Sequence, residues 1–208
     1  MIEETVLKDC GRAAAYKVLA ECYYLPDGKL LKTLDDVGKA CGGFFSQVVR
    51  SAPKANDLDR HRVDYSRLFL GPFKLLAPPY GSVYLEDGKF MGNSTFAARD
   101  LYEQEGLDIV LKDAPDHINA ELEFMYFLVL KEAEARENSD LKEAAGFHDK
   151  QASFLQVHLG RWVRRFAHNI EGNTQTGFYR ALGLATKNFV LEDLARLSGD
   201  CESRTMES

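Results

Sequence analysis

The sequence predicts an all-α protein, a single compact helical domain of about nine helices with one long irregular loop rich in proline, glycine and aromatic residues. Three observations support this prediction. Apolar residues recur at three- and four-residue steps over most of the chain, which is typical of amphipathic helices. Hydrophobic residues make up 45% of the chain and charged residues 28%, a balance typical of globular domains. A length of 208 residues fits one domain with a sizeable core.

Four helical patterns occupy the first third of the chain. The apolar stripe of the first consists of Leu7, Cys10, Ala14, Val18, Cys22 and Leu25. Pro26-Asp27-Gly28 ends this helix, a second runs from Leu30 to Gly42-Gly43, and a short third covers residues 44–49. The fourth begins near Asp57, and we expect it to direct four side chains to the core: Leu58, Tyr65, Leu68 and Phe69.

The segment from Leu70 to Asn93 lacks a helical period and forms the irregular insertion. Prolines and glycines interrupt it at Gly71-Pro72, Pro78-Pro79, Gly81 and Asp87-Gly88. One alternative is a small hairpin in which residues 83–85 pair with residues 89–91. A loop of this length is uncommon inside a compact domain, and its many apolar side chains favour packing, either on its own helices or on a partner.

Helical patterns resume after the insertion. Asn93 or Ser94 is a suitable N-cap for a helix over residues 95–105, and Gly106 suits its C′ position. Pro115-Asp116-His117 opens a long helix, which Asn138-Ser139-Asp140 ends. We expect one helix from Leu141 to about Ala167, then a final pair over residues 178–189 and 191–197. The predicted domain covers residues 1–200 and a polar tail covers residues 201–208.

Charge and hydropathy exclude several classes of protein. The formal net charge of −6 argues against nucleic-acid binding, which requires a basic face. The acidic start Met1-Ile2-Glu3-Glu4 does not resemble a secretory signal. The longest strongly apolar run, Phe124–Leu130, is far shorter than the roughly 20 residues that cross a bilayer. We therefore expect a cytoplasmic protein without stable membrane insertion.

Catalytic and metal-binding patterns are weak. His117 follows Asp116, but no Gly-x-Ser-x-Gly elbow accompanies the pair. The histidines at 148, 158 and 168 lack the helical spacing of a zinc site, and the four cysteines contain no Cys-x-x-Cys pair. No phosphate-cradling loop is present either. The sequence thus predicts a protein that is not an enzyme and binds no metal or cofactor.

Several motifs, in order along the chain, carry a family resemblance. They are Tyr65–Pro72, Ala77–Tyr84, Gly92–Thr95, Pro115–His117, Glu121–Met125 and the pattern Phe154…His158-Leu159…Trp162…Phe166. Together they resemble the TorD/DmsD/NarJ family of redox-enzyme maturation chaperones, and the string Pro-Pro-Tyr-Gly-Ser-Val-Tyr is most similar to the DmsD branch. Ala114 departs from the family motif, which often has an acidic residue there.

The resemblance implies a function. Members of the family are all-helical cytoplasmic chaperones that bind the twin-arginine leader of a molybdoenzyme catalytic subunit, such as a DMSO or TMAO reductase, and delay export until the cofactor is inserted and folding is complete. By resemblance alone, guanine nucleotide binding and a monomer or helix-exchanged dimer are also expected. The implied peptide-binding residues are Tyr65, Leu68, Phe69, Pro79, Tyr80, Tyr84, Gly92, Asp116 and His117.

The chemistry of such a leader suits this region, since its arginines need carboxylates beside an apolar trough. We expect Asp116, Glu121 and Glu123 to supply acceptors for guanidinium groups. Tyr80 and Tyr84 would add apolar area or a cation–π contact. The alternative readings are a helix cap for Asp116 and a solvated helix face for the two glutamates. The alternative function is a non-chaperone adaptor that docks a redox-enzyme subunit through the same loop.

Overall fold

The computed structural model describes residues 2–40, 45–71, 74–107 and 114–206, with side chains described within 11–36, 45–71, 74–107 and 114–199. In this part of the chain the fold is all-α, as predicted, with ten α-helices and one π-helical turn. The elements are α1 (Ile2–Cys22), α2 (Gly28–Ala40), α3 (Ser46–Arg50), α4 (Leu58–Tyr65), η1 (Ser66–Leu70), α5 (Gly81–Leu85), α6 (Asn93–Gln104), α7 (Ile118–Glu137), α8 (Leu141–Val157), α9 (Leu159–Asn173) and α10 (Gly177–Met206).

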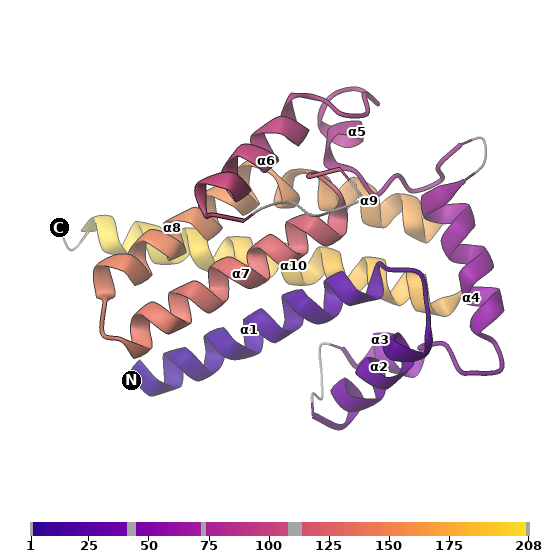
Figure 1. Ribbon diagram of the computed structural model, residues 1–208, viewed down its shortest axis with the longest axis horizontal. Coiled ribbons are helices and arrows are strands. Elements are labelled where there is room, and N and C mark those ends of the chain that lie inside the picture. Colours follow the sequence, from indigo (N-terminus) through magenta and orange to yellow (C-terminus); the bar gives the residue numbers. More distant parts are fainter. Residues whose placement is uncertain (1, 41–44, 72–73, 108–113, 207–208) are drawn as a thin grey trace.

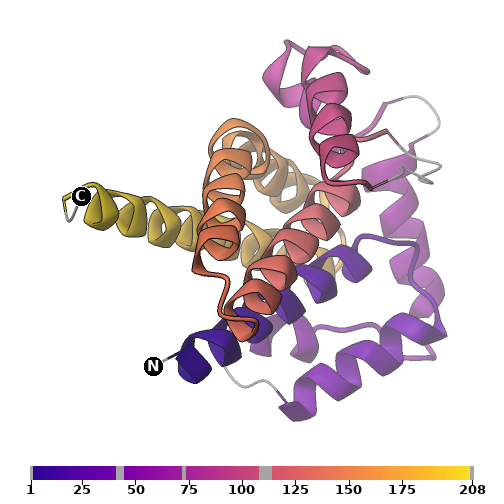
Figure 2. The same ribbon diagram turned by 60° about the vertical axis from the view of Figure 1, so that its left-hand side comes forward.

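The long helices form a bundle, with α1 packed along α7, α7 against α8, and α9 along α10 (Figure 1). α5 and α6 rise together on one side of this bundle, and α2 with α3 lies on the opposite side (Figures 1 and 2). α5 packs on α9, and this contact joins the α5–α6 pair to the bundle. Within the described ranges, no helix is long and apolar enough to cross a membrane.

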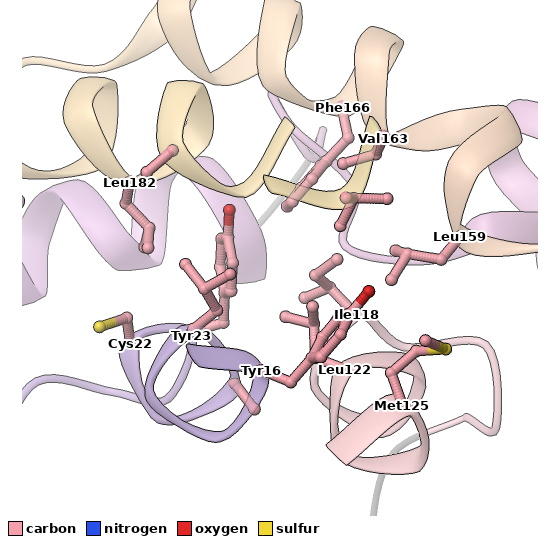
Figure 3. Close-up of a cluster of buried hydrophobic side chains, with 14 of the residues drawn as sticks. Tyr16, Cys22, Tyr23, Ile118, Leu122, Met125, Leu159, Val163, Phe166 and Leu182 are labelled. Atoms are coloured by element: carbon pink, nitrogen blue, oxygen red, sulfur yellow. The ribbon is translucent and has the colours of Figure 1, made fainter. Parts of the chain in front are cut away.

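The core lies where α1, α7, α9 and α10 meet (Figure 3). Its largest fully buried side chains include Tyr16, Tyr23, Ile118, Leu122, Trp162 and Phe166. The predicted stripe of α1 is partly wrong, because Ala14 and Leu25 are exposed. Tyr16 and Tyr23 take the buried face instead. Their hydroxyls stay satisfied in the core, one by Asp193 at 2.8 Å and the other beside Thr186 at 2.9 Å.

Two predicted helix boundaries are wrong. The helix expected over residues 141–167 is two helices, because the backbone turns at His158 (φ −117°, ψ −105°). Gly160 permits this turn, since a Cβ there would run into the carbonyl oxygen of Leu155. The expected final pair is one helix, α10, which continues through the predicted domain boundary at residue 200.

The insertion contains more regular structure than predicted. Its first residue, Leu70, ends the π-helical turn, and Gly81–Leu85 forms α5. The alternative hairpin is wrong, because residues 83–85 are helical and pack toward α9. Asp87 (φ +51°) and Gly88 (φ +86°) form the turn that follows. Gly106 adopts the left-handed conformation (φ +72°) after α6, as its predicted C′ position requires.

Candidate functional site

Three hydrogen bonds donated by backbone amides join the insertion to the start of α7. The Gly81 amide donates to the Asp116 carbonyl at 2.8 Å, and the Ile118 amide donates to the Pro79 carbonyl at 2.8 Å. The Ser82 amide donates to Asp116 Oδ2 at 2.7 Å. Asp116 is fully buried. By accepting from the Ser82 amide it caps the first turn of α5, whereas the sequence suggested that it caps the helix that follows it. We call residues 79–84 with Asp116, His117, Glu121 and Trp162 the junction.

Glu121 lies at the centre of the junction. It is fully buried, so the solvated-face interpretation is wrong for this residue. Trp162 Nε1 donates to Glu121 Oε2 at 2.9 Å. Burial raises the pKa of Glu121 well above its ordinary value of 4.5, although the Trp162 hydrogen bond lowers it. Gly81 fits between these two side chains because its Cβ would lie 3.0 Å from Trp162 Nε1 and 3.2 Å from Glu121 Oε1.

Tyr84 closes the junction on the α9 side. Its ring stacks on Trp162 with centroids 5.5 Å apart and planes inclined by 14°. Asn169 donates to its hydroxyl at 3.3 Å, and the Arg165 guanidinium lies 5.6 Å from its ring centroid. Burial raises the pKa of Tyr84. These contacts explain why an aromatic residue occupies this position in α5.

Gly92 belongs to a second tight contact. The Glu86 carboxylate accepts hydrogen bonds from the amides of Asn93 and Ser94 at the start of α6. The Ser94 hydroxyl donates to it as well, and these bonds lower the pKa of Glu86 to about 2. Gly92 is buried beneath this cap, and a Cβ there would run into the carboxylate of Glu86.

The predicted residues in α4 and η1 lie in the core. Tyr65, Leu68 and Phe69 are buried, and the Tyr65 hydroxyl donates to the carbonyl of Tyr23 at 3.2 Å. Phe69 contacts the rings of Tyr23 and Tyr65 edge-on. Pro79, Tyr84, Gly92, Asp116, His117 and Glu121 are buried too. Most of the predicted residues thus build the fold, and their contact with a peptide stays a prediction.

Two predicted residues, Tyr80 and Glu123, reach the surface. Tyr80 packs between His117 (5.2 Å) and Phe90 (4.8 Å). Phe90 is 55% exposed, and Met91 and Phe96 are exposed nearby in the sequence. Tyr80 and Phe90 thus cover His117 on the outer side of the junction.

Glu123 lines a hollow of about 440 Å³ that the sequence analysis missed. We call it the acidic hollow, and its lining residues are Glu21, Tyr24, Leu25, Asp27, Lys29, Leu30 and Glu123. Tyr24 is 40% exposed and Leu25 51% exposed. The Tyr24 hydroxyl donates to Glu123 Oε1 at 3.0 Å, which joins the end of α1 to α7. Only one weak pattern in the sequence indicates this hollow, the Tyr-Tyr-Leu run before Pro26-Asp27-Gly28, where the first helix ends.

The candidate catalytic and metal-binding histidines His117 and His158 have structural partners. His117 caps α7, since its Nδ1 accepts from the Asn119 amide at 3.1 Å. His158 stacks on Phe154, and burial lowers its pKa. Across the described residues, no group of three or more His, Cys, Asp or Glu side chains could hold a metal ion.

Comparisons with known proteins agree with the fold. Residues 29–168 match the family model described as "Nitrate reductase delta subunit". The chain is 32% identical to a Tat proofreading chaperone DmsD from Salmonella typhi and 29% identical to a chaperone protein TorD from Vibrio parahaemolyticus. These alignments cover 57% and 66% of the chain, but 53% and 64% of the relatives' own lengths.

A solved structure shows the same fold. A crystal structure described as a candidate redox enzyme maturation protein from Archaeoglobus fulgidus superposes with a TM-score of 0.59 and 23% sequence identity. The superposition covers 86% of this chain and 93% of that one. The overall fold is therefore found in a protein of distant sequence.

Proposed function

Because the chain belongs to the nitrate reductase delta subunit family, in the TorD/DmsD/NarJ group, we propose that it is a redox-enzyme maturation chaperone. In this proposal it binds the twin-arginine leader of a molybdoenzyme catalytic subunit and delays export until the cofactor is inserted. This role requires a protein that acts in the cytoplasm. The acidic hollow is the observation that carries the proposal.

The acidic hollow has the chemistry that a twin-arginine leader needs. Its lining contains three carboxylates and a single lysine, so it attracts guanidinium groups. Exposed Tyr24 and Leu25 offer apolar area to the hydrophobic stretch that follows the arginines, and Tyr24 also offers a face for a cation–π contact. Asp27 is partly engaged, since its Oδ1 accepts from the Leu30 amide at 2.9 Å. Glu21 and Glu123 are engaged to the same degree, by the hydroxyls of Thr33 at 3.1 Å and Tyr24 at 3.0 Å, so all three carboxylates can accept from guanidinium groups.

Calorimetric titration with the leader peptide of the client tests the proposal. Glu123→Gln keeps an acceptor for the Tyr24 hydroxyl but removes the charge, so we expect binding about 2- to 6-fold weaker, from about 0.5–1 kcal/mol for an exposed ion pair. Glu137→Gln is the matched control, because Glu137 is exposed on the same helix outside the acidic hollow. It should bind like the unmodified chain.

The peptide is varied in the second arm. A leader with both arginines replaced by alanine should bind weakly to the unmodified chain and should lose its sensitivity to Glu123→Gln. Equal affinity for the two leaders would refute the role of the acidic hollow. Absence of binding to either leader, with binding to the leaderless subunit, would replace leader recognition by the adaptor function.

A further inference from the structure

A second hollow, of about 600 Å³, lies between α3, α9 and α10 and has the opposite charge. We call it the basic hollow, and its lining residues are Gln47, Arg50, Ser51, Arg164, Ala167, His168, Glu171, Gly177, Arg180, Ala181, Leu184 and Lys187. Four cations and one histidine face a single carboxylate there. This excess of positive charge is notable in a chain of formal net charge −6.

The cations of the basic hollow differ from most other arginines of the protein. Arginines elsewhere commonly form ion pairs, as Arg12 does with Asp193 and Arg136 with Glu132. In the part of the chain with described side chains, Arg164, Arg180 and Lys187 form no ion pair. Arg50 is held by Ser46 of its own helix. Mutual repulsion among unpaired cations costs free energy, and a bound anion would relieve it.

The shape of the basic hollow indicates an extended ligand. It shares Arg50 and Ser51 with a neighbouring hollow that includes Lys54 and Arg60. On the other side it shares Arg164 and His168 with a hollow that includes Arg165. The three hollows thus adjoin one another through shared residues, and together their linings contain seven cations and three carboxylates, Asp57, Asp87 and Glu171.

The residues that line the basic hollow favour an acidic peptide over a nucleic acid. Ala167, Ala181 and Leu184 give the basic hollow an apolar floor, and Leu184 is 43% exposed. His168 is the only ring among its lining residues, so the hollow has no aromatic platform on which a base would stack. An apolar floor flanked by cations suits a peptide in which acidic and apolar side chains alternate.

We propose that the basic hollow docks an extended acidic segment of a protein partner, with partner carboxylates on Arg164, Arg180 and Lys187 and an apolar side chain on Leu184. Because the leader of the proposed client is cationic, it cannot be the occupant. The segment belongs instead to the mature part of the same client, an assignment that rests on the proposed function. The chain would then hold its client at two points of opposite charge.

Fluorescence anisotropy with a labelled peptide of alternating glutamate and leucine tests this site. The double variant Arg164→Gln/Arg180→Gln removes two unpaired charges from exposed positions. We expect it to bind the probe roughly 3- to 30-fold more weakly, the range for two exposed ion pairs. The double variant Lys32→Gln/Lys142→Gln makes the same change in net charge outside the basic hollow, and should bind within about twofold of the unmodified chain. Circular dichroism verifies that both variants are folded.

The outcomes separate this proposal from the proposed function. Equal weakening by both double variants, or no weakening by the first, would overturn the site whatever the leader does. Displacement of the probe by oligothymidylate at lower concentration than by unlabelled peptide would overturn the peptide assignment. Leader binding should survive Arg164→Gln/Arg180→Gln. Failure of the leader to bind even the unmodified chain, while the probe discriminates the variants, would refute only the leader proposal.

Discussion

Replacing Glu121 by glutamine measures how much free energy of unfolding is lost because an ionisable carboxyl is buried in the junction. Glutamine keeps the length of the side chain, and its carbonyl oxygen can still accept from Trp162 Nε1, which lies 2.9 Å from Glu121 Oε2. The substitution removes only the ability to ionise. It therefore isolates the titration of this one group from the packing around it.

The sign of the effect follows from the raised pKa. Above the ordinary value of 4.5, the unfolded chain loses the Glu121 proton while the folded chain keeps it. The free energy of unfolding of the unmodified chain therefore falls as pH rises, by about 1.4 kcal/mol per pH unit from this group until its raised pKa is passed. Glu121→Gln lacks this term. We therefore expect the variant to gain stability relative to the unmodified chain steadily as pH rises above about 4.5, at up to about 1.4 kcal/mol per pH unit.

Urea unfolding followed by circular dichroism at several pH values is the assay. The quantity compared is the difference in unfolding free energy between the two proteins, because other groups titrate in both and cancel. His158 is one such group, since burial lowers its pKa and gives a slope of the opposite sign. Glu137→Gln, an exposed change on the same helix, should keep the slope of the unmodified chain.

Parallel pH profiles for Glu121→Gln and the unmodified chain would refute the reasoning. They would mean that water or a rearrangement solvates the carboxylate, so that its pKa is not raised in solution. A constant offset between the two parallel profiles would measure only the packing cost of the amide, because the slope alone reports the titration of Glu121.

Two further substitutions test other contacts. Gly81→Ala should cost about 1–3 kcal/mol of unfolding free energy in urea, because its Cβ would crowd Trp162 and Glu121; a neutral result would show that the junction is loosely packed. Asp193→Asn should cost about 3–5 kcal/mol, because Arg12 donates to Asp193 at 2.9 and 3.0 Å. Burial alone would raise the pKa of Asp193, but the Arg12 charge outweighs burial and the pKa is lowered. The ion pair therefore stabilises the folded chain above about pH 3.8, and this stabilisation is lost as pH falls below that value. In thermal melts, only the unmodified chain should show this loss.

Local rules were enough for the fold class and several boundaries. Helical periodicity predicted the long helices, because an apolar face must be buried whatever its partner. Gly106 and the break at residues 138–140 were also predicted, since cap chemistry depends on a few neighbouring residues. Asp140 indeed caps α8 by accepting from the Glu143 amide at 2.9 Å. The break at His158 was not predicted, because the apolar pattern of Leu155, Leu159 and Trp162 continues across it and the turn is evident only in the close approach of Gly160 to the Leu155 carbonyl.

Functional residues were harder to interpret than helices. The motifs correctly indicated the family, but they did not show that Asp116 caps α5 across 34 positions or that Glu121 meets Trp162 across 41. A carboxylate near a helix start looks the same in a sequence whether it faces solvent or a buried indole.

By itself the sequence determined the helical class, the interruption of the long helices by an insertion and the family resemblance, since each depends on residue order alone. Only the tertiary structure decided which charges are buried and which converge. Glu21, Tyr24 and Glu123 meet in the acidic hollow because α1 packs along α7. Arg50, Arg164 and Arg180 meet in the basic hollow because α3 and α9 pack against α10. Charge acts through distance in space, and packing sets that distance.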